Sequence, residues 1–234
     1  MPQMLVKSRR YLPSKGCYEL RLEDGSRLWA SMELDDRLSD ALNRDELARL
    51  LAESEYLHAR DYALRAIGRR EHFAKEIWQR LEKRQASTAV IGRILRELTD
   101  GGLLDDERAA RAFTEEKLAR GLVGPFRIIS DLVKRGLGKD QARRIVAEVM
   151  PSNYEEDTLN RFAGRQAAAY RRKIAGELER TLGDSERTKK LGGRPGVIRH
   201  LRLKYLSKIR SKLVGAGFNG ELASRTAQRI VFKE

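Results

Sequence analysis

Three consecutive acidic residues, Asp105, Asp106 and Glu107, form a dense group of possible metal ligands beside a predicted turn. Carboxylates can hold divalent cations for phosphodiester hydrolysis, but such sites need ligands that converge from several elements around a dry cavity. These three instead precede a predicted helix, where acidic side chains accept hydrogen bonds from free backbone N–H groups and offset the helix dipole. We therefore expect the cluster to cap a helix.

The histidines and the single cysteine do not form a recognisable catalytic or metal-binding motif. His58, His72 and His200 share no metal-ligand spacing with one another or with Cys17. A lone cysteine excludes an intrachain disulfide and a thiolate-rich zinc site, and it indicates a reducing, intracellular compartment. We expect a protein that is not an enzyme, with no catalytic residues, no metal and no cofactor.

A glycine-rich basic segment, K-K-L-G-G-R-P-G, covers Lys189–Gly196. It lacks the preceding strand and the G-K-[ST] ending of a phosphate-binding P-loop. It is closer to the R-G-R-P core that enters narrow minor grooves, with Gly192 in place of the first arginine. The alternative is a flexible insertion that follows phosphates without entering the groove.

Positive charge is concentrated in the last third of the chain. The formal net charge is +14, and residues 161–234 hold 19 of the 48 basic but 6 of the 34 acidic side chains. This asymmetry indicates a polyanionic partner, most often nucleic acid, whose phosphates such residues contact without reading sequence. The alternative is a solvated helix face. Two interleaved aromatic residues, Tyr170 and Tyr205, allow limited base stacking.

The candidate residues for contact with nucleic acid or a nucleoprotein filament are Arg161, Arg165, Arg171, Arg172, Lys173, Lys189, Lys190, Arg194, Arg199, Arg202, Lys204, Lys208, Arg210 and Lys212.

The N-terminal residues predict a β-hairpin followed by helices. Two runs alternate apolar with polar residues: Tyr18, Leu20, Leu22 and then Leu28, Ala30, Met32. A loop of Glu23, Asp24 and a left-handed Gly25 would place Leu20 opposite Leu28. The pattern becomes helical from about Leu34, where Asn43 and Glu46 resemble a capping box, and no further strand is expected.

An internal repeat organises the rest of the chain. Apolar pairs recur as Ile77/Leu81, Ile128/Leu132 and Ile209/Leu213, each followed five residues later by Ala86, Leu137 or Phe218 and then by Ile94/Leu98, Ile145/Val149 or Thr226/Ile230. A helix precedes each pair, at Tyr56–Arg69, Asp106–Arg120 and Tyr154–Ala175. We predict an all-α fold of tandem three-helix repeats in an elongated curved array, with a small N-terminal β-hairpin segment.

The predicted modules are residues 1–53 (hairpin plus helix), 54–102 (repeat 1), 103–151 (repeat 2) and 152–234 (repeat 3, with a basic insertion at about 176–204). By their period, Trp29, Trp78, Phe113, Phe126 and Phe162 are expected to pack in the core, and an exposed Trp29 edge would indicate a partner site.

Two stretches resemble the bacterial RecX regulators of the RecA recombinase. G-L-L-D-D-E-R at Gly102–Arg108 is similar to the family pattern G-x-L-x-D-E-R-[FY]-A, and Gly124–Gly136 is similar to G-x-x-R-I-x-x-E-L-x-x-K-G. Ala109 stands where the family usually has an aromatic residue, Phe73 stands where a Ser or Thr cap is usual, and the insertion in repeat 3 is atypical. The matching residues include Leu104, Asp105, Asp106, Glu107, Arg108, Gly124, Pro125, Arg127, Ile128, Leu132 and Gly136.

The resemblance implies a non-enzymatic protein that binds the groove of a RecA–DNA filament. Such proteins limit filament growth, ATP hydrolysis and strand exchange, which places them in DNA recombination, DNA repair and the SOS response. We expect the partners to be the RecA filament and single- or double-stranded DNA, and the protein to be a cytoplasmic monomer. Uncharged stretches of at most eight residues are too short to cross a membrane, which needs about 20. The alternative is an independent DNA- or RNA-binding protein without sequence specificity, acting through the basic C-terminal third.

Overall fold

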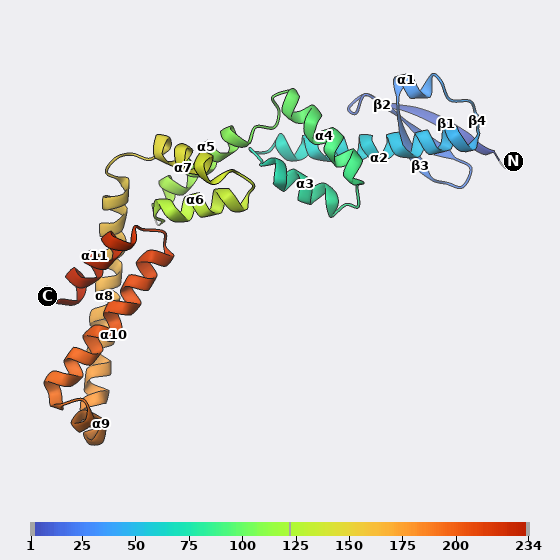
Figure 1. The fold of residues 1–234 in the computed structure, drawn as a ribbon. Coiled ribbons are helices and arrows are strands. Elements are labelled where there is room, and N and C mark those ends of the chain that lie inside the picture. The colour runs from blue at the N-terminus through green and yellow to red at the C-terminus, as the bar shows by residue number, and fades with distance from the viewer. Residues whose placement is uncertain (1–2, 122, 233–234) are drawn as a thin grey trace. The chain divides into compact units, whose positions relative to one another are not determined.

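A computed structural model describes residues 3–121 and 123–232, so the outermost residues of the predicted segments 1–53 and 152–234 lie outside it. The described chain is mainly helical with a small N-terminal sheet (Figure 1). The strands are β1 (Met4–Leu12), β2 (Cys17–Leu22), β3 (Arg27–Ser31) and β4 (Ala41–Leu42). The helices are α1 (Met32–Asp35), α2 (Arg44–Ile67), α3 (Ala74–Glu82), α4 (Thr88–Asp100), α5 (Asp106–Arg120), α6 (Pro125–Lys134), α7 (Lys139–Val149), α8 (Tyr154–Gly183), α9 (Ser185–Lys190), α10 (Gly193–Gly215) and α11 (Gly220–Phe232).

The chain forms two compact units, an N-terminal unit at Met1–Ala109 and a C-terminal unit at Ala110–Glu234. Within the described residues, every helix is too short or too polar to span a bilayer. The predicted module boundaries at residues 53, 102 and 151 stay predictions.

The sheet contains the predicted hairpin. Strands β2 and β3 are antiparallel with Leu20 opposite Leu28, and Gly25 has a φ of 86° in the turn, so both predictions are confirmed. The hairpin packs on α2, where the Trp29 backbone N–H donates to Ser54 Oγ at 2.9 Å. Burial of one sheet face against a helix supplies the support that an isolated hairpin lacks.

The sheet is nevertheless larger than a hairpin. Its four strands run in the order β3-β2-β1-β4, so the prediction that no strand follows Leu34 was wrong. Strand β4 has two residues, too few to show a period, and it pairs with the start of β1. Met32 was wrongly placed in a strand: it begins α1, because the Ser31 hydroxyl accepts a hydrogen bond from the Leu34 N–H and caps a helix there.

One helix begins each repeat: α2 in the first, α5 in the second and α8 in the third. Helix α5 covers the predicted residues, whereas α2 begins earlier and α8 continues further than predicted. The capping box of Asn43 and Glu46 is present and explains why α2 begins at Arg44.

The same turn follows the second residue of the recurring apolar pair in all three repeats, at Leu81, Leu132 and Leu213. The N–H groups of Ala86, Leu137 and Phe218 donate to the carbonyls of Leu81, Leu132 and Leu213, at 3.2, 3.3 and 3.2 Å. The residue before each donor has a left-handed φ: 62° at Gln85, 112° at Gly136 and 91° at Gly217. This C-terminal helix cap confirms the tandem repeat at the level of hydrogen bonds.

Two glycines allow the backbones of distant segments to touch in the C-terminal unit. The Gly124 N–H donates to the Ala216 carbonyl at 2.8 Å, and the Phe126 N–H donates to the Gly217 carbonyl at 3.0 Å. A Cβ on Gly124 would lie 2.2 Å from the Gly217 carbonyl oxygen, and one on Gly217 would lie 2.4 Å from the Arg127 backbone nitrogen. The contact between the start of α6 and the α10–α11 turn therefore requires glycine on both sides.

Four of the five aromatic residues expected in the core are half-buried. The fifth, Phe126, is 52% exposed, so that prediction was wrong. Pro125 and Ile128 take the inward positions at the start of α6, which turns the intervening Phe126 outward. Trp29 stacks on His58 with 3.7 Å between ring centroids. Trp78 and Phe162 pack against the clusters of buried side chains in their own units.

Candidate nucleic-acid interface

The acidic cluster caps two helices. Asp105 Oδ1 accepts hydrogen bonds from the N–H groups of Glu107 and Arg108 at 2.8 and 3.0 Å, which confirms its predicted role at the start of α5. Asp106 Oδ1 accepts from the Ala74 N–H at 2.7 Å, at the first residue of α3. Helix α3 has Phe73 at its N-cap position and no side-chain cap of its own, so Asp106 supplies the missing acceptor from another helix.

The cysteine and the histidines lie on four different segments: β2, α2, the α2–α3 loop and α10. Cys17 is buried in the sheet, and burial raises the pKa of its thiol. His72 is buried with Nδ1 2.9 Å from a Glu76 carboxylate oxygen, and burial lowers the pKa of its imidazole. Among residues 3–121 and 123–232, no three or more His, Cys, Asp or Glu side chains are grouped so that they could hold a metal ion.

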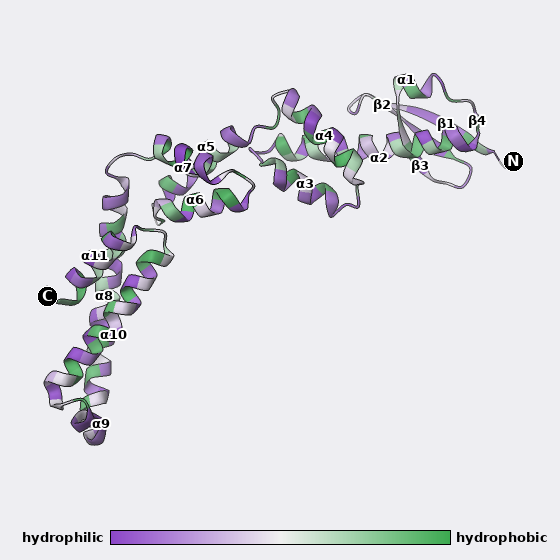
Figure 2. Cartoon of the chain, viewed as in Figure 1, coloured by the Kyte–Doolittle hydropathy of each residue, from purple (hydrophilic) through white to green (hydrophobic). Residues whose placement is uncertain are grey.

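The segment Lys189–Gly196 is not extended, so it does not have the conformation that a minor-groove hook needs. Helix α9 ends at Lys190 and α10 begins at Gly193, which puts Arg194 in the first turn of α10. Gly192 and Gly193 have φ values of 83° and 78°, and these left-handed residues make the turn between the two helices. Pro195 fits the first turn because that turn needs no donor from its nitrogen. The rest of the predicted insertion lies at the end of α8, in α9 and at the start of α10, and Figure 2 shows α9 as hydrophilic throughout.

The structure places the candidate basic residues mainly on α8 and α10, which pack side by side. Twelve of the fourteen are exposed, and Arg202 and Lys204 are half-buried. Lys204 pairs with Glu177, and the Arg202 guanidinium lies 6.0 Å from the centroid of the Phe232 ring. These two residues therefore have structural partners, whereas most of the others face solvent.

A groove of about 530 Å³ lies between α8 and α10. Its lining includes three of the candidate residues, Lys173 from α8 and Lys208 and Lys212 from α10, together with Gln166, Tyr170 and Tyr205. Lys212 Nζ donates to Gln166 Oε1 at 3.2 Å. As far as the structure describes the chain, no carboxylate lines this groove. Three ammonium groups in one groove without a counter-charge attract an anion such as a phosphate.

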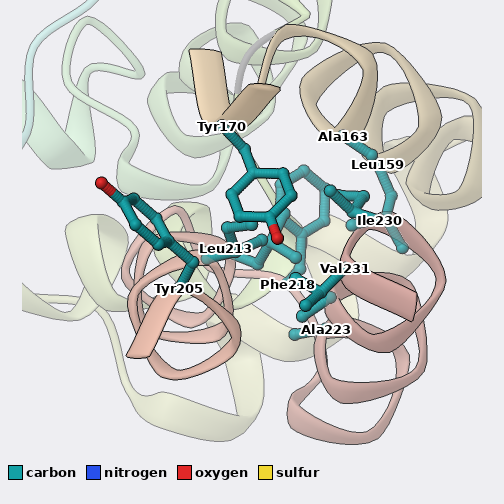
Figure 3. Close-up of a cluster of buried hydrophobic side chains, with 11 residues drawn as sticks. Leu159, Ala163, Tyr170, Tyr205, Leu213, Phe218, Ala223, Ile230 and Val231 are labelled. Atoms are coloured by element: carbon teal, nitrogen blue, oxygen red, sulfur yellow. The ribbon is translucent and has the colours of Figure 1, made fainter. Parts of the chain in front are cut away.

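The two tyrosines hold the groove together. Their rings meet edge to face with 5.2 Å between centroids, and each residue is 8% exposed. They belong to a buried cluster with Leu213, Phe218 and Ile230, and the Tyr205 hydroxyl points away from the other labelled side chains (Figure 3). Because both rings are buried, they do not offer free faces on which bases could stack.

Glu177 fixes α8 against α10. Its carboxylate accepts a hydrogen bond from the Tyr205 hydroxyl at 2.8 Å and another from the Lys204 ammonium group. These hydrogen bonds, that from Lys204 first, lower the pKa of Glu177 below its usual value. Sequence reasoning missed Glu177 and the groove residues Gln166 and Ser211, since their roles depend on which residues of α8 and α10 face each other. The spacing of Gln166, Tyr170 and Lys173 along one helix face was the available clue.

The family-motif residues of α5 and α6 have packing and capping contacts. Leu104, Ile128 and Leu132 are buried, and Arg127 Nε lies 3.4 Å from Asp131 Oδ1. Gly124 and Gly136 occupy the backbone contact and the left-handed turn described above. The motif therefore maintains helix ends and helix contacts.

The fold and the site define a tandem helical-repeat protein with a basic helical pair. Known proteins identify the family. The chain is 35% identical over 117 residues to the regulatory protein RecX of Halorhodospira halophila, covering 50% of this chain and 67% of that protein. It is 31% identical over 98 residues to the regulatory protein RecX of Chlorobium phaeobacteroides, covering 42% and 65%. The chain belongs to the RecX family.

A crystal structure of a regulatory protein RecX has the same fold. It aligns with a TM-score of 0.63 over 99% of this chain and 100% of that chain, at 16% sequence identity. No protein-family model matches the chain.

Proposed function

We propose that this chain regulates a RecA recombinase, most directly by binding the RecA–DNA filament and limiting its growth, ATP hydrolysis and strand exchange. The observation that carries the proposal is the sequence similarity to proteins named regulatory protein RecX, extending over two thirds of the Halorhodospira relative. The protein would act in the cytoplasm as a monomer, without catalysing a reaction of its own.

The basic surface of α8 and α10 supports a physical mechanism. Exposed lysines and arginines there would contact DNA phosphates, while other parts of the repeats would contact recombinase subunits. Several weak contacts on one chain gain by effective concentration, because the second and third contacts form within a complex that already exists. Such a protein binds the assembled filament better than a free recombinase subunit.

The direct test measures ATP hydrolysis by the cognate recombinase on single-stranded DNA. Substoichiometric amounts of the protein should lower the rate markedly, because each bound copy would affect many subunits. A groove variant with Lys173→Gln, Lys208→Gln and Lys212→Gln should inhibit less. A control with Lys7→Gln, Lys83→Gln and Lys139→Gln removes the same charge from exposed positions outside the groove and should inhibit as the wild type does.

These substitutions are preferable to deletion of residues 161–234. Deletion would also remove the Ala216 and Gly217 carbonyls that accept hydrogen bonds from Gly124 and Phe126, so folding and binding would change together.

The groove also favours the second candidate function, an independent nucleic-acid-binding protein. In that case hydrolysis stays unchanged, while the groove variant loses salt-sensitive binding to bare DNA. A rate unaffected by the wild-type protein would contradict filament regulation.

A further inference from the structure

The N-terminal unit contains an arginine-lined hollow that is separate from the α8–α10 groove. It has a volume of about 470 Å³ and lies at the end of α2, the following loop and α3. Five arginines line it: Arg65, Arg69, Arg70, Arg80 and Arg84. No carboxylate is part of this lining in the described part of the chain. Its volume is within the range of about 300–1,000 Å³ that is usual for small-ligand sites.

Three of these arginines have partners that hold their guanidinium groups in place. Arg65 lies 2.7 Å from an Asp61 carboxylate oxygen. Arg70 donates to the Glu71 carbonyl at 2.8 Å and pairs with Glu76 at 3.3 Å. The Arg84 guanidinium carbon lies 3.9 Å from the centroid of the Tyr62 ring.

The other two arginines, Arg69 and Arg80, have no acidic partner among the described residues. Both arginines are exposed, and Arg80 contributes to the lowered pKa of the Tyr62 hydroxyl. Because a guanidinium group carries five N–H donors, most of the donors of Arg69 and Arg80 remain free for a ligand.

Neighbouring groups respond to the excess positive charge. Hydrogen bonding from Arg84, with a further contribution from Arg80, lowers the pKa of the Tyr62 hydroxyl. Burial chiefly lowers the pKa of His72, and the charges of Arg70 and Arg80 lower it further despite the nearby Glu76. Both effects indicate a positive electrostatic potential inside the hollow.

We propose that this hollow binds a phosphate group, supplied by a nucleic-acid backbone or by a free nucleotide, with Arg69 and Arg80 as its main contacts. The planar guanidinium fork donates two parallel hydrogen bonds to phosphate oxygens, which a lysine cannot do. The sequence offered one clue, the i, i+4 spacing of Arg65 with Arg69 and of Arg80 with Arg84. Acidic residues in the same region offset the charge of these arginines, so the net charge of the region did not reveal the cluster.

The test compares the full-length wild-type protein with an Arg69→Gln, Arg80→Gln variant. One probe is a fluorescent 20-nucleotide oligothymidylate titrated at several salt concentrations. The other is pyrophosphate, whose binding to the folded state raises the melting temperature. An Arg44→Gln, Arg96→Gln variant, at exposed arginines of α2 and α4 outside the hollow, removes the same charge and is the control. Circular dichroism and melting temperature without ligand establish that each variant folds.

We expect the variant to bind oligothymidylate about a hundredfold more weakly, at about tenfold for each of the two lost charge-assisted contacts. The slope of log affinity against log salt should also fall in magnitude by about 1.4, at roughly 0.7 per lost contact to single-stranded DNA. An Arg69→Lys, Arg80→Lys variant should keep the slope and lose part of the affinity, because it keeps the charge but not the fork.

The two probes separate the sources of the phosphate. If only oligothymidylate binding weakens, the phosphate comes from a nucleic-acid backbone. If only the rise in melting temperature with pyrophosphate is lost, it comes from a free nucleotide. Unchanged behaviour with both probes would overturn the proposal. Polyglutamate serves as a third probe. A loss of binding confined to polyglutamate would also overturn the proposal, because it would assign the hollow to an acidic peptide. None of these outcomes depends on inhibition of the recombinase, so the proposed function is tested separately.

Discussion

Single side chains in this protein link segments that lie far apart in the sequence. Asp106 caps α3 from the start of α5, and Glu177 joins α8 to α10 through Lys204 and Tyr205. In each case one carboxylate satisfies donors that its own helix does not contain. A substitution at such a position therefore removes a contact between helices as well as a charge.

At Glu177 the pH dependence of stability follows from the lowered pKa. In the folded state the pKa of the Glu177 carboxyl group is below its usual value of 4.5. The stabilisation is therefore fully present above pH 4.5. It is lost as the pH falls through the folded-state pKa. We expect Glu177→Gln to lower the free energy of unfolding by about 1 kcal/mol at pH 7, with a difference from the wild type that shrinks below pH 4.5.

Denaturant unfolding measured between pH 3 and pH 7 checks this, at roughly half-unit steps across the range where acidic groups titrate. Glu179→Gln on the same helix is the matched control, because Glu179 is exposed. A stability difference that stays constant down to pH 3 would contradict the role assigned to the carboxylate.

At the level of elements, the repeats differ in the left-handed residue of the turn that follows α3, α6 and α10. Glycine occupies it in the second and third copies, at Gly136 and Gly217, while the first copy has Gln85 with a φ of 62°. A side chain in this region of φ, ψ space costs about 1–2 kcal/mol. The first repeat therefore contains strain that the others avoid.

Exchanging the residue types should change stability in opposite directions. We expect Gln85→Gly to raise the free energy of unfolding by about 0.5–1 kcal/mol, because relief of strain exceeds the entropy cost of glycine. Gly136→Ala should lower it by about 1 kcal/mol. Thermal and denaturant unfolding measure both values. Destabilisation by Gln85→Gly would show that its side chain contributes a contact that outweighs the strain.

The sequence predicted elements whose pattern is local and periodic. The alternation around Leu20 and Leu28 identified the hairpin register, and the spacing after Leu81, Leu132 and Leu213 identified the repeated turn. Strand β4 was missed because two residues have no measurable period.

Contacts across long sequence separations were also beyond prediction from periodicity. The basic composition identified Lys173, Lys208 and Lys212 as candidates, but the pairing of α8 with α10 determines that they share a groove. Likewise, the spacing of residues did not reveal that Asp106 would cap α3, because the donor at Ala74 belongs to a different helix.

For the whole molecule, the charge distribution predicts salt-sensitive binding. Most of the candidate basic residues are exposed, and a complex with 6–10 phosphate contacts should lose about 10³–10⁵ in affinity between 50 and 200 mM salt. Fluorescence anisotropy with bare DNA at graded salt measures the slope. A flat response would mean that the basic residues of α8 and α10 remain solvated and do not bind phosphates.

The contact between Gly124 and the α10–α11 turn also determines when parts of the chain can fold. A ribosome releases α6 well before it releases Ala216 and Gly217, whose carbonyls α6 needs. The N-terminal unit forms a compact unit among residues up to Ala109, whereas the start of α6 must wait for the α10–α11 turn near the end of the chain. In nascent chains stalled before Ala216, we therefore expect the N-terminal unit to resist protease and the α5–α6 junction to be cleaved.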